Sequence, residues 1–343
     1  MAFATPDGDS ALVENKPPCA PRVANEALLT LPCWLPVESM SESSSPHRII
    51  ITGATSVVGQ FLLPRLAAAG NEVYAISRKN RSNLVTIHKN IFWHSSDISH
   101  PEQLRFPSAS ALIHLAPLWL LPPLLPVLDS LHVRRVIGFG STSVFSKASS
   151  RNPDERRLAA SLAEAEETTR KLCAKFGINW TVFRPTLVYD CVRDKNITRI
   201  ANFIRRFGFF PLLGAAEGLR QPLHADDLAN ACVLALSRPV TFNRAYNLSG
   251  GETLSYRQMV AKIFHSLGRP ERFLSVPEWA FNGAIRLVRL LPGKQGLNPE
   301  MATRMNTNLC FNHAEATRDF GFSPRLFLPQ WNGSDRRYHG NQI

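Results

Sequence analysis

The residues with the clearest chemical meaning lie between Arg48 and Gly59, where the chain reads RIIITGATSVVG. A short apolar strand there leads into a turn with Gly53 and then into a helix. Such a turn binds pyrophosphate through free backbone N–H groups and the positive end of the helix. We expect Gly53 to make the tight turn and Gly59 to let the helix pack on the sheet, while Ser56 narrows the approach and offers a hydroxyl. Against the alternative of a purely structural turn, we predict a dinucleotide site formed by Gly53, Thr55, Ser56, Val57, Val58 and Gly59.

The residues after the second predicted strand bear on the choice between NAD and NADP. An acidic residue at the end of that strand usually holds the ribose hydroxyls of NAD. The chain instead has Ser77, followed by Arg78 and Lys79. A missing carboxylate and two cations favour a ribose 2′-phosphate, so we predict NADP in preference to NAD; the alternative for Arg78 is an ordinary loop charge. Asp97, after the third strand, is a candidate acceptor for the adenine amino group or a simple turn former.

These residues need a sheet that brings strand ends together, and strands and helices alternate from residue 47 onward. The predicted strands are 48–52, 72–77, 91–94, 111–115, 135–139 and 180–184, and the main predicted helices are 154–176, 196–207, 226–237, 255–267, 278–291 and 313–319. Strands 111–115 and 135–139 are almost wholly apolar, as in a parallel sheet buried on both faces. The predicted fold class is therefore α/β, a doubly wound Rossmann-type parallel sheet with a smaller, mixed C-terminal substrate lobe.

The predicted domain boundaries follow changes in composition along the chain. Residues 1–46 are rich in Pro, Ser, Ala and Glu and are expected to form a disordered tail, in which Met40 is a candidate for the natural start. Residues 47–190 are expected to form the dinucleotide-binding domain. Residues 191–330 are expected to form most of the substrate-binding lobe, with strands returning to the sheet, and residues 331–343 a flexible tail.

Composition and charge narrow the classes of partner. The 343 residues are 44% hydrophobic and 19% charged, which is typical of a globular protein. The net charge of +12, with arginines concentrated in 193–220 and 286–304, suits an anionic partner such as a phosphorylated cofactor or a nucleotide-linked substrate. A solvated basic face is the alternative. The stretch 199–206 carries no nucleic-acid reading motif, so nucleic acid is not expected as a partner.

The cysteines and the apolar segments bear on metals, location and membranes. The six cysteines are scattered, and no His or Cys cluster has zinc spacing, so no metal site is predicted. Scattered cysteines indicate reduced thiols, so a cytoplasmic location is expected. The most apolar run, 111–128, contains His114 and four prolines and is not expected to form a transmembrane segment. The amphipathic segment 278–291 is expected to pack on its own domain, with an anionic membrane or a partner protein as alternatives.

Six short segments resemble, in order, those of the short-chain dehydrogenase/reductase superfamily. They are TGATSVVG (52–59), LIHLA (112–116), GSTSVF (140–145), FRPTLVY (183–189), RQPLHADDLA (220–229) and YNLSGGE (246–252). The closer resemblance is to its extended branch, the NAD-dependent epimerases and dehydratases of nucleotide sugars, over about residues 47–328. This resemblance implies hydride transfer with NADP or NAD on a nucleotide-linked small molecule. We also consider a homodimer.

The same resemblance implies roles for four further residues. Ala116 would lie near the nicotinamide-side ribose, and Pro185 would line the nicotinamide pocket. Ser141 holds the position of the hydroxyl that hydrogen-bonds the reacting sugar oxygen, which makes it the catalytic candidate; the alternative is a strand-end serine that caps its neighbours. Arg220 holds the position that binds the substrate diphosphate, a role that a guanidinium fork suits, and the alternative is a surface ion pair.

The helix predicted over residues 154–176 departs from the family pattern. Family chemistry needs a tyrosine as general acid/base and a lysine four residues later on the same helix face, which lowers the pKa of the tyrosine. Ser161 and Glu166 match flanking family positions, which places Leu158 at the usual tyrosine position and Leu162 at the usual lysine position. Neither leucine can transfer a proton.

This departure leaves two hypotheses open. In the first, the chain is an enzyme of the epimerase, dehydratase or reductase type, with water or a substitute group handling the proton. The candidate substitutes are Tyr189, His114 and His224. Their structural alternatives are a packed aromatic for Tyr189 and a helix-start hydrogen-bond partner for His224. In the second hypothesis, the chain is a non-catalytic dinucleotide-binding regulator or assembly subunit.

Overall fold

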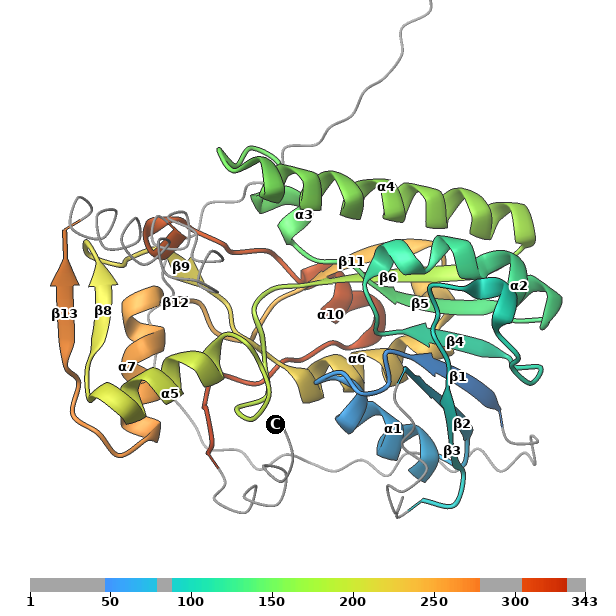
Figure 1. Cartoon of the computed structure of the whole chain (residues 1–343), viewed down its shortest axis with the longest axis horizontal. Coiled ribbons are helices and arrows are strands. Elements are labelled where there is room, and N and C mark those ends of the chain that lie inside the picture. Colours follow the sequence, from blue (N-terminus) through green and yellow to red (C-terminus); the bar gives the residue numbers. More distant parts are fainter. Residues whose placement is uncertain (1–46, 79–87, 278–303, 332–343) are drawn as a thin grey trace, which may run out of the picture. The chain divides into compact units, whose positions relative to one another are not determined.

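A seven-stranded parallel sheet lies at the centre of the part of the chain that the structure describes, residues 47–78, 88–277 and 304–331 of a computed structural model (Figure 1). The strand order is β11-β6-β5-β4-β1-β2-β3. The strands are β1 (Arg48–Thr52), β2 (Glu72–Ser77), β3 (Ile91–Ser95), β4 (Ala111–His114), β5 (Arg135–Phe139), β6 (Asn179–Pro185) and β11 (Arg244–Leu248). The chain moves outward from β1 to β3 on one side and from β4 to β6 on the other. This reversal is the doubly wound arrangement and confirms the predicted fold class.

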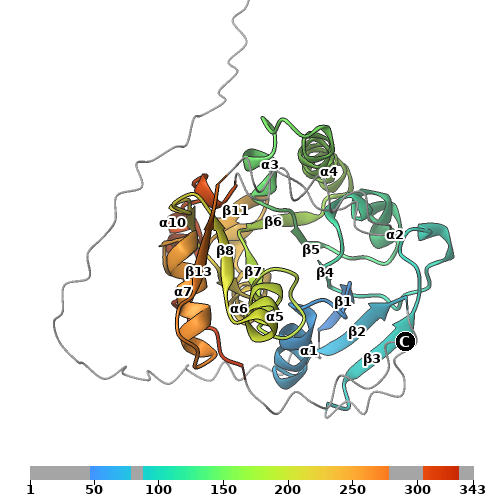
Figure 2. The same cartoon turned by 60° about the vertical axis from the view of Figure 1, so that its left-hand side comes forward.

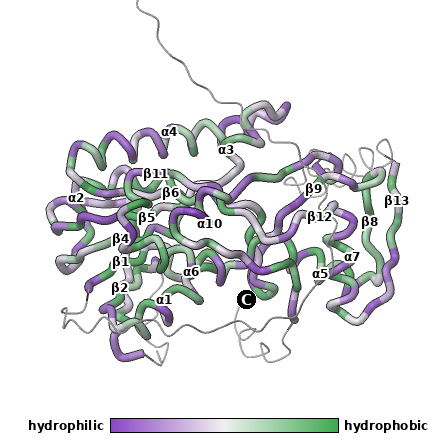
Figure 3. The backbone as a smooth tube through the Cα atoms, turned by 180° about the vertical axis from the view of Figure 1, so that it is seen from behind, coloured by the Kyte–Doolittle hydropathy of each residue, from purple (hydrophilic) through white to green (hydrophobic). Residues whose placement is uncertain are grey.

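The buried strands explain why the sheet forms where it does. Ile49, Ile50 and Ile51 of β1 are completely buried, and all of β4 is buried as well. Alternate side chains of a strand point to opposite faces, so Ile49 and Ile51 join one apolar core and Ile50 joins the other. Figure 3 shows the hydrophobic stretches gathered in these central strands.

Arg135 is the exception in the predicted apolar strand 135–139, because it is buried at the start of β5. Its Nη2 donates to the carbonyl of Ala235 at 2.9 Å and to the hydroxyls of Thr181 and Thr241 at 2.8 and 3.0 Å. Burial lowers the pKa of Arg135 to about 10. These bonds satisfy the donors of the buried guanidinium and link β5 to the helix that contains Ala235.

Helices cover both faces of the sheet (Figures 1 and 2). The helices are α1 (Gly59–Ala68), α6 (Ala225–Leu236) and α10 (Ala314–Phe320) on one face, and α2 (Leu125–Ser130) and α4 (Pro153–Phe176) on the other. The long helix α4 begins where the Asn152 side chain accepts from Asp154 N at 2.8 Å, and it ends at Gly177 with φ +63°. Among the described residues, no helix has both the length and the hydropathy needed to cross a bilayer.

A mixed lobe lies beyond one end of the sheet and has its own apolar core. Its elements are β7 (Val188–Tyr189), α5 (Ile197–Phe207), β8 (Phe210–Leu213), β9 (Leu219–Arg220), β10 (Leu223–His224), β12 (Leu254–Ser255), α7 (Tyr256–Ser266) and β13 (Phe273–Val276). The short helix α3 (Ser143–Ser146) packs beside α4 instead. Helix α7 starts with a capping box formed by Ser255 and Gln258. The segment 278–291, Lys79 and both predicted tails lie outside the described residues, except that residue 331 is described.

Candidate functional site

The carboxyl ends of β1, β4, β5 and β6 lie side by side along one edge of the sheet. The parallel register pairs Thr52 with His114, His114 with Gly138, and Phe139 with Phe183. Gly53, Ala116 and Ser141 lie one or two residues beyond the ends of β1, β4 and β5, and Pro185 is the last residue of β6. The structure therefore brings these four predicted site residues to the same edge, where ligands of doubly wound sheets bind.

The turn after β1 accepts only glycine at two positions. Gly53 has φ +66°, and a Cβ added there would lie 2.6 Å from the backbone nitrogen of Ala116. A Cβ on Gly59 would lie 2.1 Å from the carbonyl oxygen of Ala54. The roles predicted for both glycines agree with this geometry, since the first makes the tight turn and the second allows close packing of α1.

The start of α1 has free N–H groups for an anion. The Ser56 hydroxyl accepts from Gly59 N at 3.1 Å, so it occupies one of the donors at the helix start. The N–H groups of Val57 and Val58 donate to no atom of the described residues. A turn without room for a Cβ, followed by two free N–H groups at a helix start, fits a pyrophosphate group.

Ser77, the last residue of β2, is buried, and the next residue, Arg78, is exposed. Asp97 is exposed, and its Oδ1 accepts from Ser99 N at 3.0 Å and from Ser99 Oγ at 2.7 Å. These hydrogen bonds hold the pKa of Asp97 below its usual value. The Asp97 side chain therefore acts as a turn former in this structure, which is the alternative considered for it. Contact with the adenine amino group stays a prediction.

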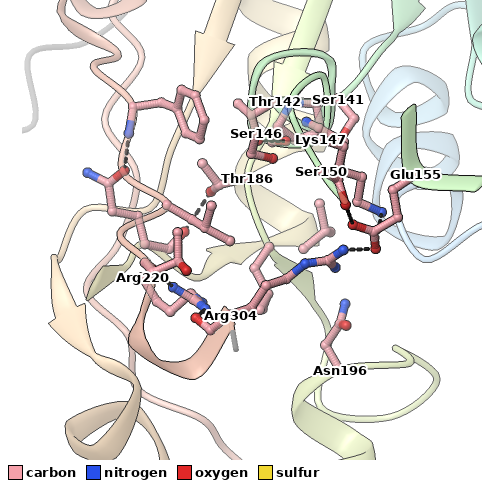
Figure 4. A pocket seen from close by; sticks show the side chains of 18 of the residues that line it. Ser141, Thr142, Ser146, Lys147, Ser150, Glu155, Thr186, Asn196, Arg220 and Arg304 are labelled. Carbon is pink, nitrogen blue, oxygen red and sulfur yellow. Dashed lines mark hydrogen bonds and ion pairs between the residues drawn. The ribbon is translucent and has the colours of Figure 1, made fainter. Parts of the chain in front are cut away.

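A pocket of about 930 Å³ lies between the sheet edge and the mixed lobe (Figure 4). Three of the predicted site residues line it: Ser141, Pro185 and Arg220. Hydroxyls make up much of the lining, contributed by Ser141, Thr142, Ser143, Ser146, Ser149, Ser150, Thr186 and Thr307. The residues predicted to contact the dinucleotide other than Pro185 do not line this pocket.

Ser141 and Arg220 both hold positions that the surrounding backbone fixes. Ser141 Oγ accepts from Ser143 N at 3.1 Å at the start of α3, so it caps its neighbour and also lines the pocket. Arg220 is buried, and its Nη1 donates to the carbonyls of Leu219 and Thr307, both at 2.7 Å. Burial lowers the pKa of Arg220. The weighed alternative of a surface ion pair does not describe Arg220, because no carboxylate among the described residues pairs with it.

A charged cluster in the same pocket was not predicted. Glu155, from the first turn of α4, accepts from Ser150 Oγ at 2.9 Å, lies 3.9 Å from Lys147 Nζ and forms an ion pair with Arg304 (Figure 4). Arg220 in turn donates to the carbonyl of Arg304. Only the crowding of arginines in 286–304 hinted at Arg304, and no spacing rule connects it with Glu155.

Leu158 and Leu162 of α4, at the positions where the family usually has tyrosine and lysine, both pack in or against an apolar core. Leu162 is buried in the core between α4 and the sheet, and the half-buried Leu158 lines a separate hollow with Trp119 and Pro122. Arg184 Nε of β6 donates to Glu166 Oε1 at 2.9 Å, which holds this part of α4 against the sheet. No proton-transferring side chain stands at either position.

The three candidate substitutes also have structural roles. His114 Nδ1 lies 2.8 Å from Thr52 Oγ1, its Nε2 lies 3.1 Å from the Pro117 carbonyl, and burial lowers its pKa to about 4. His224 Nδ1 accepts from Asp226 N at 3.1 Å, which is the helix-start role weighed for it. Tyr189 is buried against His224, and burial raises the pKa of its hydroxyl. None of the three lines the pocket.

Comparisons with known proteins agree with this architecture. Residues 49–118 and 122–249, more than half of the chain, match the model of the NAD dependent epimerase/dehydratase family. A UDP-glucose 4-epimerase from Vibrio cholerae is 22% identical over 184 residues, which cover 54% of this chain and 54% of that protein. An NAD(P)H azoreductase from Xenophilus azovorans is 32% identical over 101 residues, covering 29% of this chain and 33% of that protein. The chain spans about half or less of the length of these curated relatives.

Solved structures show the same fold. The UDP-glucose 4-epimerase of Thermotoga maritima with UDP-glucose has a TM-score of 0.60 at 15% identity, covering 82% of this chain and 95% of that one. The dTDP-glucose 4,6-dehydratase DesIV of Streptomyces venezuelae, with NAD bound, has a TM-score of 0.62 at 18% identity, covering 82% of this chain and 92% of that one.

Proposed function

Because this chain belongs to the NAD-dependent epimerase/dehydratase family, we propose that it binds a nicotinamide dinucleotide at the turn 53–59 and a nucleotide-linked sugar in the pocket of Figure 4. The observation that carries the proposal is the turn itself, which leaves no room for a Cβ at Gly53 and presents the free N–H groups of Val57 and Val58. When bound, the nicotinamide supplies or accepts a hydride. The protein's part is to hold the two molecules at one edge of the sheet.

The charges of the pocket support a phosphorylated substrate. Its described lining includes Lys147, Arg151, Arg220 and Arg304 but only one carboxylate, Glu155. A net positive, partly enclosed pocket attracts a diphosphate. We propose that Arg220, whose buried guanidinium has no carboxylate partner among the described residues, holds the diphosphate side and that Ser141 orients a sugar hydroxyl. Ala116 and Pro185, at the neighbouring strand ends, would contact the nicotinamide ribose and ring.

The cofactor preference proposed is NADP over NAD. It rests on Ser77 and Arg78 at the end of β2, where a carboxylate for the ribose hydroxyls is missing and a cation is present. The cytoplasmic location, the homodimer and the domain boundaries after residues 46, 190 and 330 stay predictions.

A second candidate function is a dinucleotide-binding protein without turnover. The apolar surroundings of Leu158 and Leu162 favour it, because a standard member of the family uses these positions for proton transfer. His114 is neutral near pH 7 with both ring nitrogens engaged, so it does not fill the gap. If the chain is an enzyme, water or another group in the pocket accepts and donates the proton.

One experiment separates the two functions. The full chain with bound NADP is mixed with UDP-glucose or dTDP-glucose, and the absorbance of the reduced nicotinamide and the sugar products are followed. Turnover supports the enzyme, whereas nucleotide-sugar binding without any change supports the second function. Ser141→Ala is expected to weaken nucleotide-sugar binding about fivefold, the value of one hydrogen bond. The control Ser130→Ala, at the exposed end of α2 and outside this pocket, should leave the binding unchanged. A dinucleotide-loaded chain that binds neither sugar would contradict the substrate proposal.

A further inference from the structure

The loop 190–196 between β7 and α5 lies against the first turn of α1 (Figure 2). Gln60 Nε2 of α1 donates to Asp190 Oδ2 at 2.9 Å. From the same loop, Arg193 reaches the cofactor turn, where its Nη2 lies 3.5 Å from the carbonyl oxygen of Ser56. A guanidinium from the mixed lobe therefore contacts the peptide group that joins Ser56 to Val57 in the dinucleotide turn.

Buried carboxylates fix the backbone that carries Arg193. Asp190 Oδ1 accepts from the N–H groups of Val192, Arg193 and Asp194 at 3.0, 2.8 and 2.9 Å. Asp194 Oδ1 then accepts from Thr198 N at 3.1 Å, at the start of α5. The position of Arg193 relative to the turn is thus set by hydrogen bonds on both sides of the residue.

The guanidinium of Arg193 is held only by long contacts among the described residues. Its Nε lies 3.9 Å from Asp190 Oδ2, which is beyond hydrogen-bond distance, and that carboxylate already accepts from Gln60 and three backbone N–H groups. The side chain is 43% exposed. The 3.5 Å contact with Ser56 O is long for a hydrogen bond, so little is lost when a better acceptor replaces it.

One backbone donor at the start of α1 is already occupied. The Ser56 hydroxyl occupies Gly59 N, so one of the N–H groups at the start of α1 is no longer free for an anion. A pyrophosphate carries two negative charges, and a guanidinium can pair with two of its oxygens at once. A cation beside the turn would replace the occupied backbone donor.

We propose that Arg193 binds the pyrophosphate of the dinucleotide, exchanging its contact with Ser56 O for hydrogen bonds to phosphate oxygens. This inference rests on the proposed function, because it assumes that the turn takes a dinucleotide. It adds a residue of the mixed lobe to the cofactor site, so that cofactor binding joins the lobe to the sheet.

The test measures binding of ADP-ribose, which contains the pyrophosphate, to the full chain by calorimetry. Arg193→Gln is expected to weaken binding about tenfold, as for loss of a charge-assisted pair. The matched control is Arg199→Gln, which removes the same charge from an exposed position on α5 and should change the affinity less than twofold. Arg193→Lys keeps the charge without the fork and should restore part of the affinity. The melting temperature of the ligand-free variants should equal that of the wild type, because the Arg193 side chain makes only long contacts with the described residues, at 3.5 Å to Ser56 O and 3.9 Å to Asp190 Oδ2.

The outcomes separate the inference from the proposed function. A wild-type chain that binds neither ADP-ribose nor NADPH contradicts the proposed function. A wild-type chain that binds ADP-ribose while Arg193→Gln binds as well as Arg199→Gln overturns the role of Arg193 and leaves the dinucleotide site intact.

Discussion

The turn 53–59 and the segment 158–162 of α4 flank the same sheet, but they differ in what carries their function. In the turn, the proposed function depends on the backbone: the positive φ of Gly53 and the N–H groups of Val57 and Val58, which donate to no atom in the described part of the chain. In α4, family chemistry depends on two side chains, and leucines stand at the positions that the sequence assigns to them.

A binding site built from backbone and a proton donor built from side chains can vary independently within one fold. A turn whose backbone is fixed by steric contact keeps its shape for as long as its glycines stay. A helix that packs on the sheet keeps its place with leucine as well as with tyrosine, because the apolar core needs only volume and hydrophobicity. A helix with leucine at both positions can therefore keep the same fold.

The largest expected effect tests whether position 162 belongs to the core. Leu162→Lys should lower the free energy of unfolding by about 4 kcal/mol, because it buries a charge without a partner. Leu158→Lys should cost only about 1 kcal/mol, because the half-buried position lets the ammonium reach water. Urea unfolding measures both. Equal costs would show that the two positions do not differ in burial as described.

The next effect concerns the turn. Gly53→Ala should lower the free energy of unfolding by about 3 kcal/mol, from the positive φ together with the contact of the new Cβ at 2.6 Å from Ala116 N. Gly70→Ala is the control, since Gly70 has φ +82° with no atom within 4 Å of an added Cβ, and it should cost about 1 kcal/mol. If the two variants unfold at the same urea concentration, a Cβ at Gly53 does not clash with the backbone of Ala116 as described.

A pH experiment asks whether His114 belongs to the framework of the turn. Its pKa in the folded chain, about 4, lies below the ordinary value of 6.5, so the unfolded chain binds the proton first as the pH falls. Stability is then complete above pH 6.5 and falls by about 2 kcal/mol between pH 7 and 5. His114→Gln should flatten this part of the curve of unfolding free energy against pH. An unchanged slope in the variant would assign the loss to other groups.

The smallest effect tests whether Arg78 determines the preference for NADPH over NADH. Arg78→Gln should weaken NADPH binding about tenfold and leave NADH binding within twofold, because only the 2′-phosphate loses a charged partner. Fluorescence titration of the bound reduced nicotinamide gives both affinities. If the variant keeps the preference for NADPH, Arg78 does not contact the 2′-phosphate.

Much of the fold could be predicted because local patterns determine it. The observed β1, β2 and β5 have the predicted bounds, and α5, α6, α7 and α10 lie within one residue of theirs. The turn was predictable for the same reason, since Gly53 and Gly59 act through contacts close to them in the chain or in the neighbouring strand.

The parts of the site that escaped prediction depend on pairs far apart in the chain. Arg193 and Ser56 are 137 residues apart, and no period or spacing connects them. Glu155 and Arg304 meet in the pocket only because α4 and the segment after residue 303 converge there. Arg220 was predicted to face the substrate, but the sequence gives no sign that backbone carbonyls of Leu219 and Thr307 hold it in place.

Calorimetric titration of the full chain with NADPH decides whether the backbone turn still does what its geometry indicates. We expect saturable heat, a rise in the melting temperature with ligand concentration, and loss of both in Gly53→Ala where that variant remains folded. Neither heat nor thermal stabilisation with saturating NADPH or NADH would contradict the account of the dinucleotide site.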